Sequence, residues 1–356
     1  MKRTLSLLLT AALALSLLAG CGPKTNADSS DSSNPGTSSG QPAGSGDQSV
    51  PEADPPAVRF MALSGPTGVG ASWLMKYYSA ESAFDGMPFV LDSTVVTDNK
   101  EVTDALVNKD VDIAAVATNV AANLYAKTDG GIQVLAVNTL GVLYILEKGD
   151  TVHSMADLSG KTLYAPSNTK GANPEHILNR LLEGNGVNPA DVNIEWLTPQ
   201  EITVKITSSD AGLCMLPVPA ATALMVQDSA VREAVSLSDA WKDLEDSPLP
   251  MGCLVARTEF VENSDPALIE AFLDLYGDSI SFMEGNLSDA AALTVELGIL
   301  PNEKVAEKAI PQCSLTFVTG REMRTMLEDY YTVLFQAAPE SIGGGLPYDS
   351  FYYGVG

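Results

Sequence analysis

The sequence predicts an α/β protein of two lobes, each built on a mostly parallel β-sheet flanked by helices. Short apolar segments alternate with helical segments through the first two thirds of residues 57–356. This alternation is typical of βαβ units around a parallel sheet that is covered on both faces. It occurs as two successive cycles, and a length of about 300 residues suits two domains of ordinary size.

The first 21 residues are typical of an export signal. The basic residues Lys2 and Arg3 precede an apolar run at 5–18, which is too short for a comfortable membrane span. The sequence LAGC at 18–21 resembles the lipobox of bacterial lipoproteins. That resemblance implies a signal peptide over 1–21 and lipidation of Cys21, and more than one acyl chain gives stable anchoring. The alternative is an ordinary secretory signal with a cysteine that occurs there by chance.

Residues 22–56 are dominated by Ser, Gly, Pro, Asp, Asn and Gln. Such a segment buries too little apolar surface to offset the entropy lost on ordering, so we expect a disordered linker. A coil of this kind reaches on the order of 30 Å on average. It would hold the folded part near the membrane without fixing its orientation.

The first cycle begins with a strand and a tight turn at 65–68 that leads into a helix ending near Tyr78. The other segments are assigned by apolar runs and by helical spacing. The expected strands are 58–63, 89–91, 112–116 and 132–138, and the further expected helices are 99–108 and 121–127.

The second cycle contains a helix with favourable start residues. Asn173 is the expected N-cap, Pro174 takes the first helical position, and Glu175 places an acid in the first turn. This helix is expected to end at Gly184 or Gly186. The expected strands are 142–147, 161–165, 193–197, 212–216 and 252–257, and the other helical segments are 154–158, 199–207 and 220–227.

From Pro266 onward the pattern is helical, with expected helices at 266–283, 288–297, 303–309 and 321–335. We expect these helices to pack back on the first lobe. The predicted lobes are therefore 57–142 plus 251–356 and, between them, 143–250. Two chain crossings, near 141–143 and 251–253, would then form a hinge that closes around a ligand.

The composition excludes several classes of function. A formal net charge of -25 argues against nucleic acid as a partner, because the phosphates would be repelled. Beyond Cys21, the cysteines Cys214, Cys253 and Cys313 lack metal-ligand spacing. They are expected to be buried free thiols, with a Cys253–Cys313 disulfide as the alternative. His153 and His176 have no second ligand at useful spacing, so we predict no metal site and no cofactor.

Ligands of parallel α/β sheets bind at the carboxyl ends of strands, where helix N-termini direct N–H groups outward. The first such edge contains Ser64, Gly65 and Thr67. Its glycines at 65 and 70 have the spacing of a phosphate-binding P-loop, but Ala71 stands where that motif requires lysine. A nucleotide site is therefore disfavoured, and a tight turn without a ligand is the structural alternative.

Three further edges offer polar groups. The second has Thr118 and Asn119, which either bind ligand or cap a helix, and the third has Asn138 and Thr139, which either line a cleft or end a strand. The fourth is the one with a cation. Its candidate residues are Ser167, Thr169, Lys170, Gly171 and Asn173.

Lys170, beside a helix N-terminus, makes the fourth edge the best anion site in the sequence, and a solvated loop is the alternative. If the solute is anionic, we expect Lys170→Ala to weaken binding by roughly 1–3 kcal/mol. No Gly-x-Ser-x-Gly motif and no nucleophile–base pair is evident. We therefore predict no catalytic residues.

Several segments resemble lipoprotein solute-binding proteins of Gram-positive anaerobes, within the nitrate/sulfonate/taurine-type group of ABC-importer binding proteins. They are ALSGPTG (62–68), DIAAVATN (112–119), LYAKT (124–128), LGVLY (140–144), DLSGKT (157–162), NPE (173–175), AIPQC (309–313), IGGGLP (342–347) and FYY (351–353). The resemblance implies the type II periplasmic-binding fold, with a small polar or anionic solute between the lobes. One departure is SNTKG at 167–171, where relatives usually have a glycine-rich loop.

The resemblance also implies a partner and a location. We expect an ABC-transporter permease as partner, attachment by lipid to the extracellular face of a bacterial membrane, and a monomer. Relatives in the broad group bind oxyanions, sulfonates, bicarbonate, or pyrimidine and flavin vitamins. The alternatives are an enzyme related to thiamine-pyrimidine synthesis, which needs a histidine in the cleft, and a surface receptor without transport.

Overall fold

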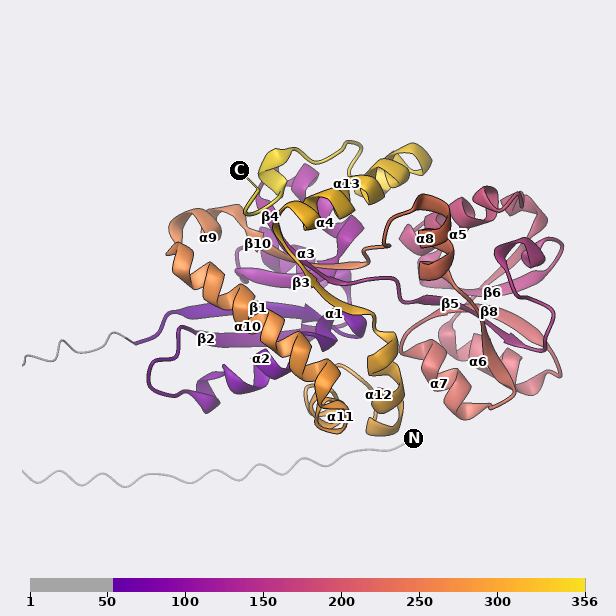
Figure 1. Cartoon of the computed structure of the whole chain (residues 1–356), viewed down its shortest axis with the longest axis horizontal. Helices are drawn as coiled ribbons and strands as arrows, with labels where there is room; N and C mark the ends of the chain where they lie inside the picture. The colour runs from indigo at the N-terminus through magenta and orange to yellow at the C-terminus, as the bar shows by residue number, and fades with distance from the viewer. Residues whose placement is uncertain (1–53, 356) are drawn as a thin grey trace, which may run out of the picture. The chain divides into compact units, whose positions relative to one another are not determined.

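A computed structural model of the chain describes residues 54–355, so the predicted signal peptide, Cys21 and nearly all of the predicted linker lie outside the described residues. The described part contains two β-sheets flanked by helices (Figure 1). The predicted α/β class with two sheets is confirmed. Among the described helices, none combines the length and hydropathy that crossing a bilayer requires.

The first sheet has six strands in the order β11-β4-β10-β3-β1-β2. They are β1 (Ala57–Leu63), β2 (Val90–Val96), β3 (Ile113–Ala117), β4 (Ile132–Thr139), β10 (Gly252–Arg257) and β11 (Leu315–Val318). β1 pairs in parallel with β2 and β3, whereas β10 is antiparallel to both of its neighbours, β3 and β4. β1 to β4 therefore point the same way, and β10 and β11 point the other way.

The second sheet has five strands in the order β7-β6-β8-β5-β9. They are β5 (Leu143–Lys148), β6 (Thr162–Pro166), β7 (Asn193–Leu197), β8 (Gly212–Pro217) and β9 (Val231–Ser236). β6, β7 and β8 are mutually parallel, and β5 runs antiparallel between β8 and β9. The chain passes from the first sheet to the second at residues 140–142 and returns before β10.

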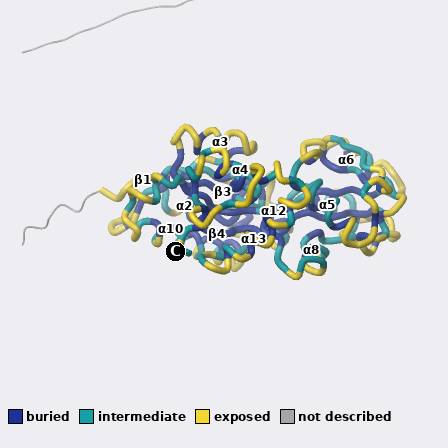
Figure 2. The backbone as a smooth tube through the Cα atoms, turned by 90° about the horizontal axis from the view of Figure 1, so that it is seen from above, coloured by how far each residue is buried: buried dark blue, intermediate teal, exposed yellow. Residues whose placement is uncertain are grey.

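Helices cover both faces of the two sheets. One apolar cluster contains buried side chains from α3 (Asn99–Val107), α4 (Thr118–Lys127), α5 (Asn173–Gly184), α8 (Leu237–Glu245) and α13 (Gly320–Ala337). The other contains side chains from α1 (Pro66–Val69), α2 (Ser72–Tyr77), α6 (Pro199–Ser208), α7 (Ala220–Gln227), α10 (Pro266–Gly285), α11 (Leu287–Glu296) and α12 (Glu303–Ala309). Figure 2 shows the strands as mainly buried, with the exposed segments on the helices and loops around them.

Both clusters include side chains from both sheets, so apolar packing continues across their junction. In the first cluster Val137 of β4 and Ile145 of β5 are both fully buried. The rings of Trp241 in α8 and Tyr330 in α13 lie 5.9 Å apart. Such contacts stabilise the observed arrangement of the two sheets through burial of apolar surface.

A buried carboxylate anchors each sheet at the end away from the crossings. Asp112, just before β3, accepts hydrogen bonds from Arg59 Nε at 2.9 Å and from Arg257 at 2.7 Å. Burial raises the pKa of Asp112, but these hydrogen bonds outweigh burial and leave the pKa below its ordinary value. Glu147, near the end of β5, is held similarly by Thr151 and Arg232.

Several elements were not expected from the sequence: β9, α8, β11 and the short α9 (Thr258–Asn263). β2 was predicted over 89–91, but it continues to Val96. This last difference matters for the site, because it adds another strand end to the edge where α3 and α4 begin.

Candidate functional site

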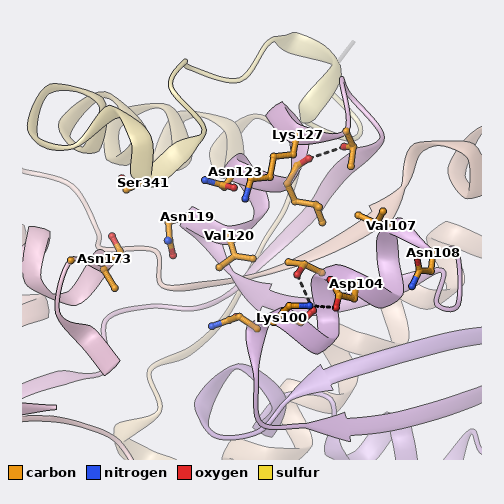
Figure 3. A pocket seen from close by; sticks show the side chains of 16 residues that line it. Lys100, Asp104, Val107, Asn108, Asn119, Val120, Asn123, Lys127, Asn173 and Ser341 are labelled. Atoms are coloured by element: carbon orange, nitrogen blue, oxygen red, sulfur yellow. Dashed lines mark hydrogen bonds and ion pairs between the residues drawn. The ribbon is translucent and has the colours of Figure 1, made fainter. Parts of the chain in front are cut away.

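A cavity of about 650 Å³ lies where α3 and α4 meet the segment before α5 (Figure 3). One side is formed by the first sheet's helices and the other by Gly171, Ala172 and Asn173 of the second. The lining residues are Asn99, Lys100, Thr103, Asp104, Val107, Asn108, Asn119, Val120, Asn123, Leu124, Lys127, Thr128, Gly171, Ala172, Asn173 and Ser341. The cavity therefore joins side chains that are attached to different sheets.

The local sequence explains why these helices begin here. β2 ends at Val96, and Asp98 caps α3 by accepting a hydrogen bond from the Lys100 N–H at 2.8 Å. β3 ends at Ala117, and α4 begins at the next residue. Because β2 and β3 both run parallel to β1, the first turns of α3 and α4 share the carboxyl edge of the sheet, which is where α/β sheets bind ligands. From there the cavity extends along both helices to their last residues.

Most of the lining residues are polar and their net charge is slightly positive, although the surface that they present to the cavity is more apolar than polar. Five asparagine side chains offer both donors and acceptors, and Lys100 and Lys127 exceed the single carboxylate, Asp104, by one charge. Lys100 pairs with Asp104, whereas Lys127 forms no ion pair within residues 54–355. None of these lining residues is aromatic. Such a surface suits a small solute with several hydrogen-bonding groups or a negative charge.

Three of the residues predicted for the site line the cavity: Asn119, Gly171 and Asn173. The prediction that Asn173 caps α5 is wrong, because the N-cap is Ala172 and no side chain caps the helix. Asn173 is instead the first helical residue, and its Oδ1 accepts a hydrogen bond from the Tyr330 hydroxyl at 2.9 Å. Its side chain is therefore used in a contact that links α5 to α13.

The first predicted edge forms the turn between β1 and α1, and Ser64, Gly65 and Thr67 are not among the lining residues. The Gly65 N–H donates to the Ile299 carbonyl at 3.3 Å. The Thr67 carbonyl accepts from the Asn138 amide at 3.0 Å. These contacts give the turn a structural role, and ligand contact by its residues stays a prediction.

Four other predicted residues are buried and form hydrogen bonds inside the protein. The hydroxyls of Thr118 and Thr169 donate to the carbonyls of Pro250 at 2.8 Å and Pro166 at 2.6 Å, respectively. Asn138 Nδ2 donates to the Tyr276 hydroxyl at 2.8 Å, and the Thr139 hydroxyl donates to Asn138 Oδ1 at 3.2 Å. Thr118 does not cap α4. Buried polar groups need such partners, and ligand contact by these four residues stays a prediction.

Ser167 and Lys170 are exposed and are not among the lining residues. They lie on the 3₁₀ turn Ser167–Thr169 and just after it. The cations of the cavity are instead Lys100 and Lys127, which the sequence interpretation missed. A prediction that β2 ends at Val96 would have identified Lys100 as a residue just after the end of a strand. Lys127 follows Asn119 and Asn123 at helical spacing on one face of α4.

None of the described cysteines and histidines is among the residues that line this cavity. Cys214, Cys253 and Cys313 are buried free thiols, and burial raises the pKa of Cys214 and of Cys313 to about 12. Cys253 and Cys313 belong to different apolar clusters. His153 and His176 are not lining residues, and no group of His, Cys, Asp and Glu in the described part could hold a metal.

Comparison with known proteins assigns the chain to a family. Residues 91–290 match the model of the family described as NMT1/THI5 like. No curated protein matches the chain in sequence.

Solved structures share the fold at low sequence identity. An ABC transporter from Parabacteroides distasonis is similar with a TM-score of 0.69 and 21% identity, covering 83% of this chain and 98% of that chain. The periplasmic aliphatic sulphonate-binding protein SsuA from Escherichia coli has a TM-score of 0.65 and 16% identity, covering 84% and 92%. The ligand-binding component of an ABC-type import system from Staphylococcus aureus has a TM-score of 0.61 and 14% identity, covering 83% and 96%. The predicted periplasmic-binding fold is confirmed by these likenesses.

Proposed function

This chain belongs to the NMT1/THI5-like family, and from that premise we propose that it is the solute-binding component of an ABC importer. The observation that supports the proposal most is the cavity to which both sheets contribute, lined by five asparagines and two lysines. The solved proteins of similar fold include a sulphonate-binding protein, an ABC transporter and the ligand-binding component of an ABC-type import system. The solute-binding role needs no covalent chemistry, because recognition by hydrogen bonds and charge is sufficient.

Solute capture follows from the connections between the sheets. The proposed lobes are 57–142 plus 251–356 and 143–250, and the segments 140–142 and 246–251 join them. A few residues at each crossing are enough to absorb a hinge rotation. A solute that contacts Asn119 on one lobe and Asn173 on the other binds the closed form better than the open form. Its binding therefore shifts the population toward closure.

The lining also favours a class of solute. Lys100, Lys127 and the asparagine amides offer donors to a carboxylate, a sulfonate or another oxyanion. The lining residues provide no aromatic ring on which a pyrimidine or flavin could stack. A small anionic or strongly polar solute is therefore the form of the proposal that we favour.

The proposed location is the extracellular face of a bacterial membrane. Its support is the sequence of residues 1–21, in which LAGC resembles a lipobox, and the polar composition of the residues that follow; lipidation at Cys21 is part of the proposal. The proposed partner is an ABC-transporter permease, which receives the solute from a monomeric binding protein.

The test is a thermal-shift screen of the unlipidated protein against nitrate, sulfonates, amino acids, pyrimidines and flavins. A solute that binds the folded state alone stabilises it by about 2.7 kcal/mol at one hundred times its Kd. We expect a sulfonate or another small anion to raise the melting temperature. If all five classes leave the melting temperature unchanged, the proposed function is wrong for these solutes.

Uptake separates transport from the other two functions considered. Deleting the gene should abolish uptake of the identified solute, whereas a receptor without transport would leave uptake intact. An enzyme of thiamine-pyrimidine synthesis would need a histidine at the cavity, and neither His153 nor His176 lines it. Replacing both histidines with Gln should therefore leave solute affinity and uptake unchanged.

A further inference from the structure

Two adjacent tyrosines of α13 contact the first residues of two helices that contribute to the cavity lining. The Tyr330 hydroxyl donates to Asn173 Oδ1 at 2.9 Å, and the Tyr331 hydroxyl donates to the Thr118 carbonyl at 2.7 Å. Asn173 begins α5 beside the second sheet, and Thr118 begins α4 beside the first. One turn of α13 thus contacts the starts of α4 and α5, two of the three α-helices that contribute to the cavity.

The contact of Tyr330 fixes how the Asn173 carboxamide is oriented. An asparagine side chain has one acceptor end and one donor end, and the Tyr330 hydroxyl uses the acceptor end. Among the described residues, the donor end has one weak partner, the Met251 Sδ at 3.9 Å. Asn173 is only 4% exposed, but it lines the cavity. Toward a solute, Asn173 therefore keeps its two N–H donors and the second lone pair of Oδ1.

The tyrosine itself has little freedom to move. Tyr330 is fully buried, and its ring lies 5.9 Å from that of Trp241 and 5.5 Å from that of Tyr331. A side chain packed on two aromatic neighbours keeps its hydroxyl at one position. This packing makes Tyr330 suitable as a fixed reference for a residue on another element.

We propose that Tyr330 is a positioning residue for solute binding, which holds the Asn173 carboxamide with its N–H groups available to a solute that accepts hydrogen bonds. This proposal rests on the proposed function, because it assigns a role within the same cavity. The hydroxyl of Tyr330 does not touch the solute. It acts through Asn173 and keeps the start of α5 in place.

Two substitutions in the full chain separate this role from general packing. Tyr330→Phe removes the hydroxyl and keeps the ring. The matched control Tyr331→Phe removes the neighbouring buried hydroxyl, which contacts Thr118 at the start of α4. Asn173→Asp keeps an acceptor for Tyr330 but removes both N–H donors. Hydrogen exchange of residues 171–178 reports on the start of α5 without any ligand.

We expect Tyr330→Phe to raise exchange in residues 171–178 several-fold and Tyr331→Phe to leave this segment unchanged. Asn173→Asp should retain the protection. Equal exchange in Tyr330→Phe and wild type, or an equal rise in both tyrosine variants, would overturn the positioning role. These results do not depend on any solute being found, so failure of the proposed function would be seen separately.

Binding supplies the second measurement, with ethanesulfonate as the probe in calorimetric titrations. Tyr330→Phe should weaken its binding about tenfold, as for loss of one buried hydrogen bond, while Tyr331→Phe changes it much less. Asn173→Asp should weaken binding at least as much, because it removes the N–H donors and also places a carboxylate beside an anion. Affinity unchanged in Asn173→Asp would show that the carboxamide donates nothing to this solute. If wild type does not bind ethanesulfonate, that compound is excluded as the solute and the exchange data alone decide the role of Tyr330.

Discussion

Gly65 lies against Pro219 at the junction of the two sheets, since a Cβ atom on Gly65 would stand 4.0 Å from the Pro219 Cδ. Gly65 follows β1, and Pro219 follows β8. The backbone of Gly65 has φ 88° and ψ −158°, a region that residues with a Cβ atom rarely adopt. The conformation, rather than the contact, requires glycine at the point where the sheets meet, because 4.0 Å is an ordinary van der Waals distance.

We predict that Gly65→Ala destabilises the protein by about 1–3 kcal/mol, because alanine is strained in this conformation. Urea unfolding followed by circular dichroism measures the change. Gly285→Ala is the matched control, since a Cβ atom there meets nothing within 4 Å and alanine favours the helix that Gly285 ends. An equally stable Gly65→Ala variant would show that the turn relaxes without cost.

A second prediction concerns the buried Asp112. Asp112→Asn removes a charge that Arg59 and Arg257 both contact, and we expect a loss of about 2–3 kcal/mol in the free energy of unfolding at pH 7. The loss is limited because the Arg59 side chain is 40% exposed and water screens its charge. Chemical denaturation at pH 7 measures it, with Asp104→Asn as an exposed control that should change little.

The lowered pKa of Asp112 predicts how this stability difference changes with pH. The pKa of Asp112 is lowered in the folded protein, so its contribution is fully present above the unfolded pKa of about 3.9 and is lost as pH falls through the folded value. The difference between wild type and Asp112→Asn should therefore be constant from pH 7 to pH 5 and shrink below about pH 3.9. A difference that grows on acidification would contradict the assignment.

The fold was predictable where apolar periodicity was strong and less so at the sheet edges. In the edge strand β2, exposed Asp92 and Thr94 alternate with more buried neighbours. Because of these polar residues, the sequence did not indicate that the strand continues after Leu91. Leu237 and Trp241 in α8 have helical spacing and follow the N-cap Ser236, so that helix could have been found. β11 is short and half-buried throughout, which leaves no alternation to detect.

The candidate site was predictable only in part. The rule that ligands bind at strand ends selected Asn119 and Asn173, because both follow strands with clear apolar runs. The rule could not distinguish buried from exposed hydroxyls and amides. Thr118 and Asn138 are buried and form hydrogen bonds within the protein. The contact between Asn173 and Tyr330 joins residues 157 positions apart, and no local pattern in a single sequence indicates such a pair.

A third prediction concerns the thiols, with Cys21→Ser used to leave Cys214, Cys253 and Cys313. Burial raises the pKa of Cys214 to about 12, so the reactive thiolate is scarce at pH 8. We expect none of the three to react with iodoacetamide in the native protein and all three to react in denaturant without a reductant. Labelling of Cys214 alone in denaturant would reveal a Cys253–Cys313 disulfide and contradict the structure.

The fourth prediction compares two lysines as anion ligands. Lys127 lines the cavity and forms no ion pair within the described residues, whereas Lys170 is exposed beside it and is not a lining residue. For an anionic solute we expect Lys127→Ala to weaken binding about tenfold, as for loss of a charge-assisted hydrogen bond, and Lys170→Ala to act less. Calorimetric titrations at low and at high salt measure both, and salt should reduce the Lys127 effect because screening weakens exposed charges.

Lys127→Gln controls for side-chain volume. If Lys170→Ala weakens binding and Lys127→Ala does not, the anion contacts the loop at 167–171, and the sequence-based assignment of the cation is the correct one.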